Sequence, residues 1–169
     1  MTIPKEAAVH YNSGCAFMEN KELQEARLAF EDALECFPNF VVALFNLGNC
    51  LLDLGKNSEA SCYYVRAINI DPNDSAIHFN YGRALVRMNL FKEAVAELDL
   101  AIKIAPRNSE MHYTLALYCA AAELPAKACR HGIKAISLSP LAPICYTAMI
   151  EVVLLNFCNI IIRARTRKQ

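Results

Sequence analysis

The sequence predicts an all-α fold: a right-handed α-solenoid of four helix–turn–helix units followed by an apolar C-terminal helix. Two observations carry this prediction. The chain has an internal period of 34 residues, and within each period the apolar residues recur at helical spacing. The period is clearest in the prolines, which are Pro38, Pro72, Pro106 and Pro140. Three columns of small residues keep the same step: Ala26, Ala60, Ala94 and Ala128; Ala33, Ala67, Ala101 and Ala135; and Gly14, Gly48 and Gly82 with Ala116.

Each column has a mechanical role in a pair of antiparallel helices. Small residues let two helices approach closely, and each proline ends a second helix because the residue before it is pushed out of helical geometry. Asn73 or Asp74, and also Asn108, stand where the N-cap of the following helix belongs. We therefore predict a repeat domain over residues 1–142, with units at residues 7–40, 41–74, 75–108 and 109–142.

This unit resembles the tetratricopeptide repeat (TPR). The first three units each supply six of the family's signature positions; in the second unit these are Leu47, Gly48, Ala60, Tyr64, Ala67 and Pro72. The fourth unit departs from the pattern, because Ala116 replaces the glycine and Gly132 replaces the large residue seen as Tyr64. A glycine inside a helix costs about 1 kcal/mol against alanine, so we expect the fourth unit to be the least stable. Pro125 falls at the start of its second helix, where a missing N–H is tolerated.

The resemblance implies a concave groove lined by the first helix of each unit, with the second, fifth, sixth and ninth positions facing a partner. The fifth position is aromatic in every unit, and the sixth is asparagine in the first three. Aromatic side chains supply contact area, and an asparagine offers one acceptor and two donors to a peptide bond. The predicted peptide-binding residues are Tyr11, Asn12, Phe45, Asn46, Asn49, Phe79, Asn80, Arg83 and Tyr113. The alternative is structural: the aromatics pack between helices, and the asparagines bond to neighbouring helix ends.

The same register bears on the class of partner. One sub-class of the family clamps the C-terminal carboxylate of chaperones with lysine and arginine. The corresponding positions here are Tyr11, Cys15, Asn46, Ala76 and Asn80, or in the next register Phe45, Asn49, Asn80, Glu110 and Thr114. Both sets lack the required cations, so we predict a protein or peptide partner other than a chaperone C-terminus. A separate group of cations in the third unit is a candidate for receiving an acidic partner residue: Arg83, Arg87 and Arg107.

Charge and motifs argue against other functions. Lysine plus arginine equals aspartate plus glutamate at 17 each, which argues against nucleic-acid binding. His10, His78 and His112 share the fourth position of their units, a packing site, and His131 stands alone on a second helix. The sequence contains no phosphate loop, metal-ligand pair or nucleophile motif. We therefore predict a protein that is not an enzyme, with no catalytic residue, metal or cofactor.

The eight cysteines form no Cys-x-x-Cys pair and no zinc-finger spacing. Residues 1–12 lack the apolar segment of a secretory signal, so we expect a reducing, cytoplasmic compartment. In that setting we expect the cysteines to be small buried hydrophobic residues.

Residues 143–162 are almost entirely apolar, with Glu151 as their one charge, and residues 163–169 form a basic tail. Three interpretations stay open: a helix that caps the solenoid, a membrane anchor, and a surface for self-association. An anchor is opposed by Glu151, Asn156 and Asn159. The function predicted is that of a non-enzymatic adaptor or scaffold binding a partner peptide. The alternatives are a membrane-anchored receptor on an organelle surface and the substrate-binding arm of a larger enzyme.

Overall fold

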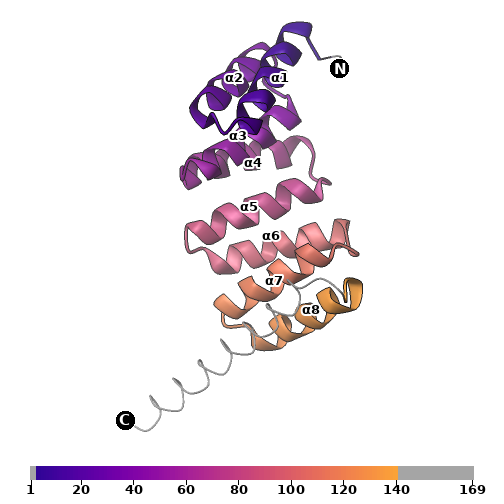
Figure 1. The fold of residues 1–169 in the computed structure, drawn as a ribbon. Coiled ribbons are helices and arrows are strands. Elements are labelled where there is room, and N and C mark those ends of the chain that lie inside the picture. Colours follow the sequence, from indigo (N-terminus) through magenta and orange to yellow (C-terminus); the bar gives the residue numbers. More distant parts are fainter. Residues whose placement is uncertain (1–2, 141–169) are drawn as a thin grey trace, which may run out of the picture. The chain divides into compact units, whose positions relative to one another are not determined.

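The computed structural model describes residues 3–140, which form eight α-helices and no strand (Figure 1). The predicted all-α class is therefore confirmed. The helices are α1 (Lys5–Glu19), α2 (Leu23–Cys36), α3 (Val41–Asp53), α4 (Asn57–Ile70), α5 (Ser75–Arg87), α6 (Phe91–Ile104), α7 (Ser109–Ala121) and α8 (Pro125–Leu138). The apolar segment 143–162 and the basic tail 163–169 lie outside the described residues.

The described residues divide into two compact units, which we call unit 1 (residues 3–89, α1–α5) and unit 2 (residues 90–140, α6–α8). Within unit 1 each helix packs on the next along the chain, and α6, α7 and α8 do the same in unit 2 (Figure 1). The period of the sequence is visible in where helices begin. The second helices start 34 residues apart, at Leu23, Asn57, Phe91 and Pro125.

The ends of the helices follow from local chemistry. Every second helix ends two residues before its proline, and the residue between them has an extended backbone, with φ values from −145° to −122°. At the N-termini, the Asp74 side chain accepts from Ala76 N at 2.8 Å, and Asn108 accepts from Met111 N at 3.0 Å. These two residues are the predicted N-caps, whereas Asn73 is not a cap.

The turn inside each helix pair contains one residue in the left-handed region. These residues are again 34 apart: Lys21 (φ 63°), Gly55 (φ 76°), Asn89 (φ 63°) and Glu123 (φ 60°). In three of the turns the following N–H bonds back five residues, as Lys56 N does to Leu51 O at 2.8 Å. This is the Schellman arrangement, which satisfies carbonyls at the end of the first helix. Only one of the four positions is glycine, so composition alone does not mark them.

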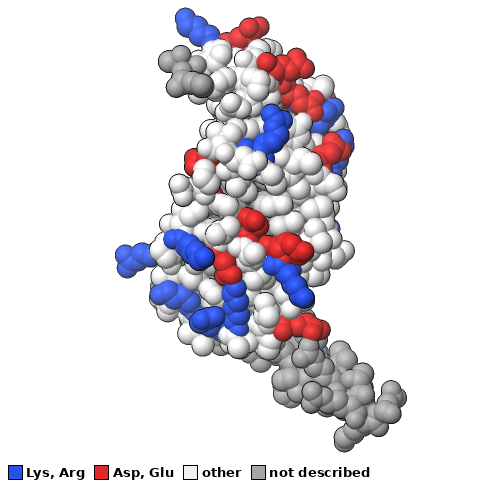
Figure 2. Space-filling view, turned by 180° about the vertical axis from the view of Figure 1, so that it is seen from behind, with Lys and Arg blue, Asp and Glu red and all other residues white. Residues whose placement is uncertain are grey.

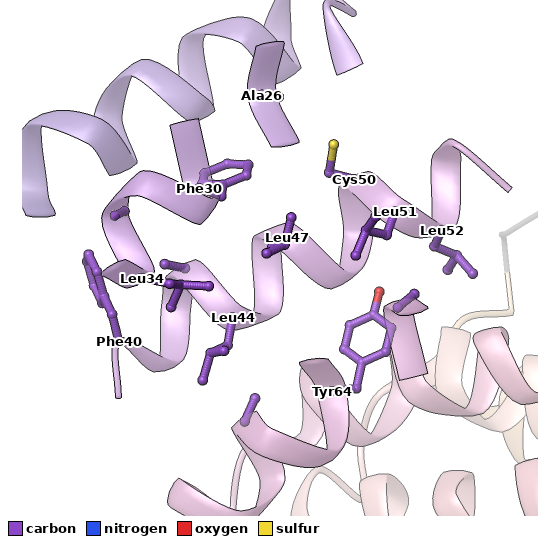
Figure 3. Packing of buried hydrophobic residues seen from close by; sticks show 14 of the residues in the cluster. Ala26, Phe30, Leu34, Phe40, Leu44, Leu47, Cys50, Leu51, Leu52 and Tyr64 are labelled. Carbon is purple, nitrogen blue, oxygen red and sulfur yellow. The ribbon is translucent and has the colours of Figure 1, made fainter. Parts of the chain in front are cut away.

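The core of unit 1 is built on contacts between a small residue and a large one. A Cβ atom added to Gly14 would lie 2.5 Å from the Phe30 ring, and one added to Gly48 would lie 2.7 Å from the Tyr64 ring. Phe30 and Tyr64 are fully buried, together with leucines of α3 such as Leu47 (Figure 3). The two glycines therefore allow aromatic rings to fill the space between paired helices.

The core of unit 2 is built differently, mostly from small side chains. Its buried positions include Leu98, Leu115 and a set of alanines: Ala94, Ala101, Ala116, Ala120, Ala128 and Ala135. Gly132 is buried in α8 at the register position that Tyr64 holds in α4. Pro125 occupies the first turn of α8, as predicted.

The expectation of buried cysteines is only partly right. Cys50 and Cys119 are buried, but Cys62 and Cys129 are exposed. The expectation fails for these two because they lie off the buried stripes of α4 and α8, which run through Ala60, Tyr64 and Ala67 and through Ala128, Gly132 and Ala135. Cys15 and Cys36 are half-buried, and the remaining two cysteines lie outside the described residues.

Candidate peptide-binding site

The predicted binding residues of the first three repeats all belong to unit 1, on α1, α3 and α5. These helices are neighbours in space, since α3 contacts both α1 and α5. Asn12 is exposed, and the others are half-buried: Tyr11, Phe45, Asn46, Asn49, Phe79, Asn80 and Arg83. We call these eight residues the first-helix face of unit 1. Tyr113 is half-buried on α7 and belongs to unit 2.

Tyr11 and Asn46 join two successive repeats. The Asn46 amide donates from Nδ2 to the Tyr11 hydroxyl at 3.1 Å, and the Tyr11 ring packs 5.1 Å from that of Phe40 and 5.9 Å from that of Phe30. Burial raises the pKa of Tyr11 to about 12, with the neighbouring Cys15 adding to the shift. The hydroxyl therefore stays protonated at neutral pH and keeps a hydrogen to donate. Within the described residues, Asn46 Oδ1 accepts no hydrogen bond.

Phe45 and Asn49 are arranged around Tyr64. The ring of Phe45 lies 6.3 Å from the ring of Tyr64, and the Tyr64 hydroxyl donates to Asn49 Oδ1 at 2.7 Å. Burial raises the pKa of Tyr64, so this hydroxyl is a permanent donor. The Asn49 carbonyl is thus occupied, while among residues 3–140 its Nδ2 hydrogens bind no acceptor.

The Asn80 side chain forms both of its hydrogen bonds within its own helix, α5. Its Nδ2 donates to Ala76 O at 3.1 Å, and its Oδ1 accepts from Arg83 at 2.8 Å. Asn80 therefore serves to hold Arg83, whose guanidinium has further donors for a partner. The neighbouring Arg87 donates to the carbonyl of Leu52, at the C-terminal end of α3. That contact anchors one guanidinium nitrogen of Arg87, and the exposed side chain has further N–H donors, as Arg83 does. Arg107, the third arginine expected to receive an acidic residue, belongs to unit 2.

Two of the predictions made for the histidines, those for His10 and His131, are wrong. His78 and His112 are buried as predicted, each with Nε2 3.1 Å from a proline carbonyl, of Pro72 and Pro106 respectively. His10 is not a packing residue, because it lies partly exposed with Nδ1 3.7 Å from Asp32.

His131 does not stand alone. Its ring stacks on that of His112 at 5.1 Å, and the two Nδ1 atoms are 2.9 Å apart. Sequence spacing could not show this pair, because it joins two helices across 19 residues of chain.

This pair lines a feature that the sequence did not indicate, an open pocket of about 640 Å³ formed by α6, α7 and α8. The pocket holds four basic side chains, Lys103, Lys127, Arg130 and Lys134, and one acidic residue, Asp99. Lys127 forms an ion pair with Asp99. The sequence feature that could have indicated this pocket is the composition of α8, which carries three basic residues and no acidic one.

A metal site has weak support in the described residues. Glu6, His10 and Cys36 bring their ligand atoms within 4.8 Å of one another at the surface of unit 1. Metals bind the thiolate, and partial burial together with the carboxylates of Glu6 and Asp32 raises the pKa of the Cys36 thiol, which disfavours the thiolate.

Over residues 3–140, no helix is long and apolar enough to span a bilayer.

Sequence comparison identifies the class. Three family models, each described as tetratricopeptide repeat, match residues 7–40, 29–60 and 63–118. The chain therefore belongs to the TPR family, whose members are typically non-enzymatic and form scaffolds for protein–protein interaction. Among curated proteins, none matches the chain significantly in sequence.

Solved TPR structures share the fold. The MamA protein superposes with a TM-score of 0.82 at 20% identity, covering 90% of this chain and 83% of MamA. YrrB, described as a TPR protein with an unusual peptide-binding site, gives 0.77 at 24% identity, covering 85% and 74%. PilF of Pseudomonas aeruginosa gives 0.78 at 20% identity, covering 89% and 68%. At these identities the likeness shows a common α-solenoid fold.

Proposed function

We propose that this protein is a non-enzymatic adaptor that binds a partner peptide along the first-helix face of unit 1. The observation that carries the proposal is that this face combines half-buried aromatic rings with amide groups whose hydrogen-bonding capacity is only partly used. Phe45 and Phe79 offer apolar contact, while Asn46 Oδ1 and Asn49 Nδ2 have no hydrogen-bond partner among residues 3–140. An acceptor and a donor on one helix suit the N–H and C=O of a peptide backbone.

The intramolecular contacts support binding rather than oppose it. Two separate hydrogen bonds, from Asn46 to Tyr11 and from Tyr64 to Asn49, order these side chains before a ligand arrives. Binding to a preorganised surface costs less conformational entropy. A partly exposed Arg83 adds a positive group at one end of the face, which favours a peptide carrying a carboxylate there. The comparison with YrrB, a TPR protein with a peptide-binding site, agrees with this class of ligand.

The test begins with selection of peptides from a random phage-displayed library on the full-length chain. The selected peptide is then titrated by calorimetry against Phe45→Ala and Asn49→Ala. Loss of a central aromatic anchor should weaken binding at least about tenfold, and loss of the amide less. Val65→Ser is the matched control, because Val65 is 39% exposed on α4, a second helix.

Phe45→Ala also removes a contact with Tyr64, so its melting temperature must be measured beside its affinity. Asn49→Ala leaves the ring contacts in place and tests the amide separately. Equal affinity of the wild type and both variants for every selected peptide would refute the proposed site.

A further inference from the structure

We propose that unit 2 carries a second docking site, the pocket between α6 and α8, and that it binds an acidic peptide segment of a partner protein through one apolar side chain. The site is distinct from the first-helix face of unit 1 and does not depend on it. It is assembled from residues of α6, α7 and α8 around the His112–His131 pair.

Unbalanced positive charge is the first observation. Of the four basic side chains in the pocket, Lys127 is neutralised by Asp99. Within the described residues, Lys103, Arg130 and Lys134 form no ion pair and no side-chain hydrogen bond. Figure 2 shows lysine and arginine atoms gathered on one side of the region formed by α6–α8. The whole chain has a net charge of zero, so this concentration of charge is local. Carboxylates are the complementary groups.

The second observation is the apolar surface that lines the pocket beside the basic side chains. Ile133 is 63% exposed and lines the pocket with Ile102. A single exposed isoleucine needs no explanation on a surface. Beside a pocket of about 640 Å³, it provides a place for a leucine-sized side chain to be buried while carboxylates bind at the rim.

The third observation concerns the histidine pair, whose hydrogens can be assigned from their partners. The Pro106 carbonyl only accepts, so His112 Nε2 carries a hydrogen, and in the neutral ring His112 Nδ1 is an acceptor. The 2.9 Å contact then requires a hydrogen on His131 Nδ1. Neutral His131 therefore has a bare Nε2.

A bare ring nitrogen selects the class of ligand. It accepts a hydrogen bond from a peptide N–H, whereas the oxygens of a carboxylate or of a phosphate dianion have no hydrogen to offer it. An acidic peptide carries both carboxylates for the cations and N–H donors for this nitrogen, and a phosphate dianion has no such donor. Together with the exposed isoleucine, this favours an acidic peptide over a phosphate group or a nucleic-acid backbone. A peptide satisfies the cations, the apolar surface and the ring nitrogen at once.

The test uses the full-length chain and two fluorescein-labelled peptides. The probe has one leucine flanked on both sides by glutamates, and the reference has glutamines in place of the glutamates. By fluorescence anisotropy at low ionic strength, we expect the glutamate peptide to bind at least about tenfold more tightly, and its binding to weaken as salt is raised. Failure of the glutamate peptide to bind, or equal binding of both peptides, overturns the proposal.

Substitutions of pocket residues test whether the glutamate peptide binds in this pocket. Arg130→Glu combined with Lys134→Glu should weaken the glutamate peptide at least about tenfold, and Ile133→Ser should weaken it severalfold. The matched control is Lys92→Glu, because Lys92 is an exposed lysine of α6 that does not line the pocket. Circular dichroism checks that each variant folds. An equal loss in Lys92→Glu, or no loss in the double variant, overturns the assignment.

Two more measurements test the independence of the two sites and the identity of the occupant. Loss of glutamate-peptide binding in the Arg130→Glu, Lys134→Glu double variant but not in Phe45→Ala assigns this peptide to the pocket. An equal loss in Phe45→Ala overturns that assignment, so failure of either site is recognised independently of the other. Sedimentation velocity tests whether a second copy of the chain occupies the pocket. A concentration-dependent dimer that is lost in Ile133→Ser overturns the partner-peptide proposal.

Discussion

Unit 1 and unit 2 use the same helix-pair geometry but fill it with different side chains. In unit 1 a glycine of the first helix faces a buried ring, as Gly48 faces Tyr64. At the same register positions α7 and α8 have Ala116 and Gly132, so one methyl group is added and a whole ring is removed. The repeats of the two units therefore share the placement of their helices but differ in the side chains that fill the space between those helices. Unit 1 depends on rings, and unit 2 on alanines and a histidine pair.

The largest expected effect on stability comes from removing the Tyr64 ring. Tyr64→Ala should lower the free energy of unfolding by about 3–5 kcal/mol, because a fully buried aromatic is lost and a cavity remains. Tyr64→Phe is the control that removes only the hydroxyl bonded to Asn49, with an expected loss of about 1 kcal/mol. Urea denaturation followed by circular dichroism measures both. Similar losses in the two variants would mean that the hydroxyl, not the ring, holds the repeat.

The same substitution should have opposite signs in the two units. Gly48→Ala places a Cβ atom 2.7 Å from the Tyr64 ring and should cost about 1–3 kcal/mol through overpacking. Gly132→Ala should instead raise stability by up to about 1 kcal/mol, because alanine is the better helix former and no ring occupies this register position. Melting temperatures of the two single variants give the comparison. A loss of stability in both would show that the space near Gly132 is already filled.

A smaller effect is expected in the turns. Gly55→Ala should cost about 1 kcal/mol because the φ of 76° is unfavourable for a residue with a Cβ atom. Glu123→Gly, at the equivalent turn of unit 2 with φ 60°, should raise stability by about 0.5–1 kcal/mol. Urea denaturation of each single variant provides the measurement. The sharpest contradiction would be a glycine at residue 123 that lowers stability, since that would assign the Glu123 side chain a larger stabilising role than the strain it carries.

The smallest expected effect is a pH dependence confined to unit 2. Burial, assisted by His112, lowers the pKa of His131. The unfolded chain then takes up the proton at higher pH than the folded chain, so stability is lost as pH falls below about 6.5 and on through the folded pKa. His131→Asn keeps a side-chain donor toward His112 and should flatten this dependence. Melting temperatures between neutral pH and about pH 5 test it, and parallel curves for the two proteins would contradict it.

Local rules in the sequence determined much of this protein. The prolines end each second helix, Asp74 and Asn108 cap the helices that follow, and the small-residue columns mark the close contacts between paired helices. These features were predictable because each depends on a residue and its immediate neighbours in a repeated register. The TPR class follows from the same period.

Only the tertiary structure decided how the polar side chains are used. Asn46 bonds to a tyrosine 35 residues earlier, Asn80 is held within its own helix, and His131 meets His112 from another helix. The left-handed turn residues were also invisible, since three of the four are not glycine. The physical reason is that a period in sequence specifies where helices lie, whereas a hydrogen bond depends on side-chain rotamers and on how two helices cross. Those quantities exist only once the helices have packed.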